Sequence, residues 1–148
     1  MPFLLLKLVH VVAAIVAVGA NVTYAFWLRR AGHDRERLTW AIRGIQALDS
    51  RLANPAYIVL LVTGAWMVLG GAFSFQTGWI VAALVLYVVL LIVGIFVYAP
   101  TIQRQLEEAE HDPSSPAYAA IERRSTLLGI STLIAVLAIV ALMVTKPF

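Results

Sequence analysis

The chain has 148 residues, of which 61% are hydrophobic and 13% charged, and its mean hydropathy is +0.88. A soluble domain averages about 45–50% apolar and about 25% charged residues, so this composition indicates an integral membrane protein of one domain, 1–148. The absence of cysteine excludes disulfides, zinc-thiolate sites and iron–sulfur clusters. Although the net charge is +3, every arginine lies in two short polar segments between apolar runs, which favours contact with lipid headgroups and excludes nucleic acid as the partner.

Four apolar runs are long enough to cross a bilayer, whose hydrocarbon core takes about 20 helical residues. They lie near residues 3–28, 55–72, 79–99 and 125–145. Inside lipid each backbone polar group must bond within its own segment, so the runs predict helices. Asn54-Pro55 predicts where the second helix begins, with asparagine as N-cap and proline at the first helical position. The expected fold is an all-α integral membrane protein, a four-transmembrane-helix antiparallel bundle.

The two polar segments, 29–54 and 100–124, carry all nine arginines, whereas Lys7 and Lys146 lie near the opposite helix ends. The positive-inside rule therefore predicts a multi-pass protein of the bacterial inner membrane with both arginine-rich loops in the cytoplasm. Both termini and a tight turn at 73–77 are then expected outside.

The first polar segment has a helical pattern of apolar residues, with arginines on its other face. The pattern predicts a cytoplasmic or interfacial amphipathic helix between spans 1 and 2, or an extension of the second span. Its apolar positions are Leu38, Ile42, Ile45, Leu48 and Leu52. In the second segment a turn is expected at Asp112-Pro113, and Ser115-Pro116 predicts a helix start. The preceding EEAEH is expected to be a charged, solvated loop rather than a metal site.

His10 shares one face of the first span with small residues, which allow helices to approach closely in membranes. These are Ala13, Ala14, Ala17, Asn21 and Ala25. His10 is therefore expected to point into the bundle, as ionisable groups in membranes usually do. Two readings stay open: an axial ligand of an iron, or a hydrogen bond to another helix.

Other side chains at the same depth would suit a haem, because thioethers can ligate iron and lysines can meet propionates. The thioethers are Met67 and Met143, which would otherwise fill core gaps. The lysines are Lys7 and Lys146, which would otherwise snorkel to headgroups. The aromatic candidates are Trp66, Trp79 and Tyr87.

The opening LKLVHVVAAIV, the stretch RERLTWAIRGIQALDSRLANPAYIVLLVTGAWMVL, the segment QTGWI and the ending VALMVTKPF carry a resemblance to a known family. The chain resembles the HemJ-type protoporphyrinogen oxidase family, small four-span bacterial proteins that bind haem b. The resemblance implies haem ligation by His10 and oxidation of a porphyrin with quinone as acceptor. The third run, IVAALVLYVVLLIVGIFVYAP, lacks that family's lysine and histidine, so the chain is also similar to a sister group of uncharacterised predicted integral membrane proteins.

The leading hypothesis is a haem-b-binding inner-membrane protein with an electron-transfer or haem-related redox role. Its cofactor-binding residues would be His10, Lys7, Lys146 and Met143, with the iron on His10. One alternative is an accessory subunit of a larger membrane complex, or a homo-oligomer, without cofactor. The small residues Gly64, Gly94 and Gly129 favour that alternative. The other alternative is an enzyme, an oxidoreductase of the protoporphyrinogen oxidase type.

Overall fold

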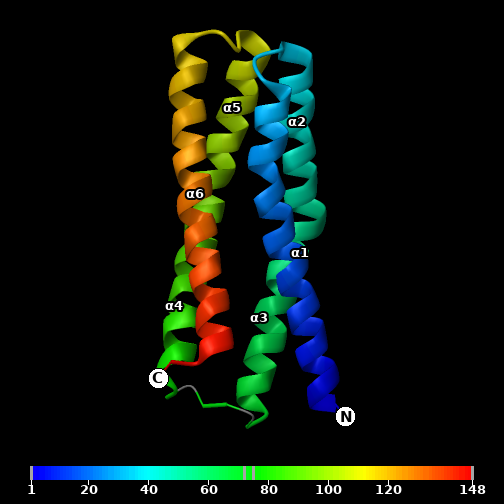
Figure 1. Cartoon of the computed structure of the whole chain (residues 1–148), viewed down its shortest axis with the longest axis vertical. Coiled ribbons are helices and arrows are strands. Elements are labelled where there is room, and N and C mark those ends of the chain that lie inside the picture. Colours follow the sequence, from blue (N-terminus) through cyan, green and yellow to red (C-terminus); the bar gives the residue numbers. More distant parts are fainter. Residues whose placement is uncertain (1, 72, 75, 148) are drawn as a thin grey trace.

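A computed structural model describes residues 2–71, 73–74 and 76–147 as four long antiparallel helices (Figure 1). Two of them contain a short π-helical segment, so that each is made of three consecutive elements. The elements are α1 (Pro2–Ala31); α2 (Arg35–Leu48), η1 (Asp49–Ala53) and α3 (Asn54–Leu69); α4 (Gly78–Val93), η2 (Gly94–Tyr98) and α5 (Ala99–His111); and α6 (Pro116–Thr145). All four long helices are apolar enough to cross a membrane. The predicted all-α, four-span fold is confirmed.

Both ends of the chain and the 70–77 connection lie at one end of the bundle, called here the terminal end (Figure 1). The short connections at residues 32–34 and 112–115 lie at the other end, the loop end. A helix of 30 residues is about 45 Å long, while the hydrocarbon core is about 30 Å thick. Part of the bundle therefore extends beyond the hydrocarbon core.

The polar segments are helical, which corrects the expectation of a solvated loop at EEAEH: those residues complete α5. For residues 35–53 the sequence left two predictions open, a separate amphipathic helix or an extension of the second span. The extension is confirmed, because α2 runs on through η1 into α3. Both polar helices remain ordered because their apolar faces meet in a loop-end core. This core comprises Leu38, Ile42, Ile102, Leu106, Ala109 and Tyr118. Of the expected stripe, Leu38, Ile42 and Ile45 on α2 are buried and Leu48 is half-buried, whereas Leu52 on η1 is 48% exposed.

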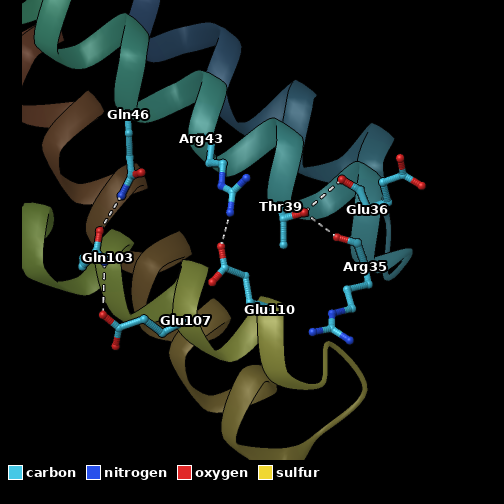
Figure 2. Close-up of polar contacts among 8 residues, drawn as sticks. All are labelled: Arg35, Glu36, Thr39, Arg43, Gln46, Gln103, Glu107 and Glu110. Carbon is cyan, nitrogen blue, oxygen red and sulfur yellow. Dashed lines mark hydrogen bonds and ion pairs between the residues drawn. The ribbon is translucent and has the colours of Figure 1, made fainter.

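Polar contacts on the surface of the loop end hold α2 against α5 (Figure 2). The Arg43 guanidinium donates to Glu110 over 2.6 Å, and the Gln46 amide donates to Gln103 over 3.0 Å. Exposed pairs of this kind contribute about 0.2–1 kcal/mol each. The apolar contacts beneath them therefore supply most of the stabilisation of this end.

The α-helical element α3 begins at Asn54, as predicted, but Asn54 is not an N-cap, because it has helical backbone angles and follows η1 without a break. Pro55 removes a backbone donor and its ring crowds the carbonyl four residues earlier. The preceding turn widens to a π-helix, in which the Asn54 N–H bonds to the Asp49 carbonyl. The same solution recurs before Pro100, where the Ala99 N–H bonds to the Gly94 carbonyl.

The other two turn signals are confirmed. The Ser114 N–H donates to the Asp112 side chain over 2.9 Å, and Ser115 caps α6 by accepting from the Tyr118 N–H over 3.0 Å. The cap places the buried ring of Tyr118 in the loop-end core. The N-terminal turn of α6 is therefore fixed both by the cap and by packing.

Replacing Ser115 with Ala should lower the free energy of unfolding by about 1 kcal/mol, because the cap hydrogen bond is lost. Detergent-denaturation curves followed by far-UV circular dichroism would measure the change. Ser131→Ala is the matched control, since the Ser131 hydroxyl bonds only to the Leu127 carbonyl of its own helix. Equal stability of the two variants would contradict a stabilising role for the cap.

Below the loop end the bundle consists of two helix pairs, α1 with α3 and α4 with α6 (Figure 1). Among the described residues no Cα atom of α3 lies within 8 Å of a Cα atom of α4 or α6. A hydrogen bond of 2.8 Å from the Tyr87 hydroxyl on α4 to the Tyr57 carbonyl on α3 bridges the pairs. The Tyr87 side chain therefore connects α4 to α3, whereas α1 and α6 have Cα atoms within 8 Å of each other.

Candidate functional site

The candidate site lies on the contact between α1 and α3, and His10 contributes its imidazole from α1. Ala13 and Ala17 are buried against Ala56, which lets the two helices approach closely. Towards the terminal end, His10 Nδ1 lies 2.8 Å from Thr63 Oγ1. His10 therefore faces the neighbouring helix, as its position among small residues predicted.

The hydrogen bonds of Thr63 determine which nitrogen of His10 carries the proton. A hydroxyl has one hydrogen, and the Thr63 hydroxyl lies 2.6 Å from the Val59 carbonyl of its own helix, to which it donates. With that hydrogen directed to Val59, Thr63 Oγ1 accepts from His10, an arrangement that favours the tautomer with the proton on Nδ1 and the lone pair on Nε2. The hydrogen bond of His10 to Thr63 uses Nδ1, and the residue as a whole is half-buried.

Gly64 gives the imidazole its room on α3. A Cβ atom at this position would lie 3.3 Å from His10 Cε1 and 3.8 Å from Nδ1. The first distance is shorter than an ordinary carbon–carbon contact of about 3.5–4.0 Å. The absence of a side chain at Gly64 therefore allows the ring to lie against α3.

The other predicted cofactor residues have different surroundings. Lys146 ends α6 in the left-handed conformation, and its Nζ lies 5.0 Å from the ring centre of Phe73 and 5.7 Å from that of Trp79. Lys7 and Met143 are exposed, and neither side chain forms a hydrogen bond or ion pair within the described residues. The structure therefore brings Thr63 and Gly64, rather than a lysine, into contact with His10.

The remaining thioether and the aromatic candidates are divided between the interior and the surface. Met67 is buried one turn beyond Thr63, and Trp79 is buried on α4. Trp66 is 66% exposed, as expected of a residue in the aromatic belt. Within the described residues no group of three or more His, Cys, Asp or Glu side chains could hold a metal ion.

A polar network on the same α1 face was not foreseen. The Asn21 amide donates to the Tyr57 hydroxyl over 2.7 Å, and the Tyr24 hydroxyl donates to Asp49 over 2.5 Å. The face therefore continues through Tyr24, which is buried, and not through Ala25, which is exposed. Helical spacing from His10 reaches Tyr24 as well as Ala25, whereas residue size alone favours Ala25.

The comparisons with known proteins agree with this architecture. A family model described as predicted integral membrane protein (DUF2269) matches residues 4–147. Neither the curated proteins nor the solved structures yield a significant match. Because the family model covers nearly the whole four-helix bundle, the chain belongs to the DUF2269 family of predicted integral membrane proteins.

Proposed function

We propose that this protein binds haem b through Nε2 of His10 and has an electron-transfer or haem-related redox role. The observation that carries the proposal is the orientation of the imidazole. Its Nδ1–H donates to Thr63, whose own hydrogen is taken by the Val59 carbonyl. Metal-ligating histidines almost always donate their second nitrogen to an oxygen in this way, which fixes the tautomer and the ring orientation.

The residues around His10 fit the group on three further grounds. Gly64 lets the imidazole lie against α3, the His10 residue is only half-buried, and helices α3 and α4 are not packed directly against each other. Lys7, three residues before His10, and Lys146 would supply positive charge for propionates. Met143 or Met67 would supply a thioether as second ligand.

A bound haem would supply reversible one-electron chemistry. The chain's own part is to hold His10 in one tautomer and to keep it in an apolar surrounding. With two protein ligands electron transfer is favoured, whereas an open position favours reaction with a small molecule.

The same proposal includes an orientation in the bacterial inner membrane. All nine arginines belong to the polar segments, whose connections lie at the loop end. Because cytoplasmic segments carry the excess of arginine and lysine, the loop end would face the cytoplasm. His10 would then lie in the outer half of the bilayer.

Absorption spectra of the protein purified from cells with ample haem test the proposal. We expect a Soret band in the wild type and its loss in His10→Ala. His33→Ala is the matched control, because His33 belongs to the connection between α1 and α2, where it lies 3.9 Å from Glu122. Either of two results would contradict haem ligation by His10: a wild type without a Soret band, or a Soret band of equal strength in His10→Ala.

The hydrogen bond between His10 and Thr63 also favours a second function, that of a cofactor-free subunit in a larger assembly. In that case the role of the imidazole is to form an interhelical hydrogen bond between α1 and α3. His10→Ala would then change the migration of the protein on a native gel while the pigment content stayed the same. The two functions therefore predict opposite outcomes for one variant.

A further inference from the structure

A cleft of about 940 Å³ lies at the loop end where the last turn of α1 faces the start of α2. Two tryptophans form its apolar part, and their rings meet edge to face with centroids 6.2 Å apart. Two alanines and four charged residues form the rest. The lining residues are Trp27, Trp40, Ala31, Ala41, Arg30, Arg37, Asp34 and Glu36.

The depth of the cleft places it among lipid headgroups. Trp27 follows Phe3 by 24 positions in one helix, which corresponds to about 36 Å. The hydrocarbon core is about 30 Å thick, and about 40–45 Å with its headgroup layers. Trp27 therefore lies at a membrane interface, where tryptophan is enriched. Arg30 lies three positions beyond Trp27 in α1, on the side away from the hydrocarbon core.

The charges of the cleft are of both signs and are not neutralised by one another. Among the described residues the ion pairs are His33 with Glu122 and Arg43 with Glu110, so none of the four charged cleft residues is paired. Asp34 is held in place because one of its oxygens accepts from the Arg37 backbone N–H over 2.9 Å. The cleft thus presents two guanidinium groups and two carboxylates beside an aromatic wall.

We propose that this cleft binds the headgroup of a phospholipid that carries both a phosphate and a primary ammonium, as phosphatidylethanolamine does. Arg30 and Arg37 would hold the phosphate, since guanidinium matches phosphate oxygens in pairs. The Glu36 and Asp34 carboxylates accept from the ammonium. Trp27 and Trp40 lie against the glycerol and the first acyl carbons. A purely anionic headgroup would leave both carboxylates repelled and unpaired.

Tryptophan fluorescence can test this site in the full chain. The chain has four tryptophans, so the variant Trp66→Phe/Trp79→Phe retains only the two of the cleft. This parent is placed in phosphatidylcholine bilayers with equal fractions of phosphatidylethanolamine or phosphatidylglycerol, brominated near the headgroup. We expect phosphatidylethanolamine to quench more, with a relative affinity about twofold to fivefold higher, the range that an exposed charge pair gives.

Variants of the parent show which residues are responsible. Glu36→Gln should remove the preference over phosphatidylglycerol, and Arg30→Ala/Arg37→Ala should lower quenching by both lipids. Arg43→Ala is the control, since Arg43 bonds to Glu110 and lies outside the cleft. Equal quenching of the parent by the two lipids would mean non-selective lipid contact. Stronger quenching by phosphatidylglycerol would mean that the cleft is a site for anionic lipid. Either result in the parent alone overturns the proposal.

Discussion

Replacing Ala17 with Leu is expected to lower the free energy of unfolding by about 3 kcal/mol, the upper part of the range for overpacking a close contact. Ala17 is completely buried and packs with Ala13 against Ala56. A leucine there has no free volume, so α1 and α3 must move apart. Close approach through small residues is what associates helices in lipid, where no hydrophobic effect drives them together.

The separation would also stretch the hydrogen bonds that flank Ala17 on the same face. Asn21 donates to Tyr57 on one side, and His10 pairs with Thr63 on the other. Interhelical hydrogen bonds in membranes contribute about 0.6 kcal/mol each on average. Their loss would add to the cost of overpacking rather than replace it.

Gly19→Leu is the matched control for Ala17→Leu. It places the same side chain two positions further along α1, where a Cβ atom meets nothing within 4 Å. We expect this variant to be as stable as the wild type or slightly more so, because leucine favours helix more than glycine does. Detergent-denaturation curves of the three proteins measure the difference. Equal midpoints for Ala17→Leu and Gly19→Leu would contradict a tight α1–α3 contact.

Composition and periodicity were sufficient to predict the four helices and the inward face of α1. The runs around 3–28, 55–72, 79–99 and 125–145 could only be helices in lipid. They correspond to α1, α3, α4 with η2, and α6, although α3 ends at Leu69 and residue 99 already belongs to α5. His10, Ala13, Ala17 and Asn21 face α3 because residues three or four apart share one side of any helix. These features depend on local geometry, which the sequence carries directly.

The features that were missed depend on contacts between helices. A proline marks either a helix start or a widened turn within a helix, and only the packing of α2 on α5 favours continuity through Asn54-Pro55. Likewise, a threonine in an apolar run can bond to its own helix. Thr63 does so and also meets His10, but spacing within α3 cannot indicate what lies opposite.

The contacts of Lys146 likewise depend on another part of the chain and could not be predicted from spacing within its own helix. A lysine near a helix end is expected either to snorkel or to meet an anion. In the fold, the 70–77 connection brings Phe73 to the end of α6, and Trp79 packs against Phe73 with ring centroids 5.4 Å apart. The ammonium therefore lies against two aromatic rings. Cation–π contacts of this kind contribute about 0.5–1 kcal/mol at exposed sites, which is enough to select this position for a flexible side chain.

Replacing Thr63 with Val is expected to weaken haem binding about 10-fold to 100-fold, the usual cost of removing the oxygen that orients a ligating histidine. This expectation rests on the proposed function. Valine keeps the shape of threonine but cannot accept from His10 Nδ1–H. The ring would be free to turn and to move its proton to Nε2, the nitrogen that ligation requires unprotonated. The interhelical hydrogen bond itself contributes only about 0.6 kcal/mol on average, so the fold should survive.

Two measurements separate the orienting role of Thr63 from haem binding itself. Titration of the purified protein with haem, followed at the Soret band, gives the affinities of the wild type, Thr63→Val and Thr63→Ser, and the serine variant should bind like the wild type because it keeps the hydroxyl. Nitrogen chemical shifts of ¹⁵N-labelled histidine in the haem-free protein report the tautomer of His10. We expect the Nδ1–H form in the wild type and in Thr63→Ser, and a mixture in Thr63→Val. An unchanged tautomer in Thr63→Val would refute the orienting role of Thr63, whether or not haem binds.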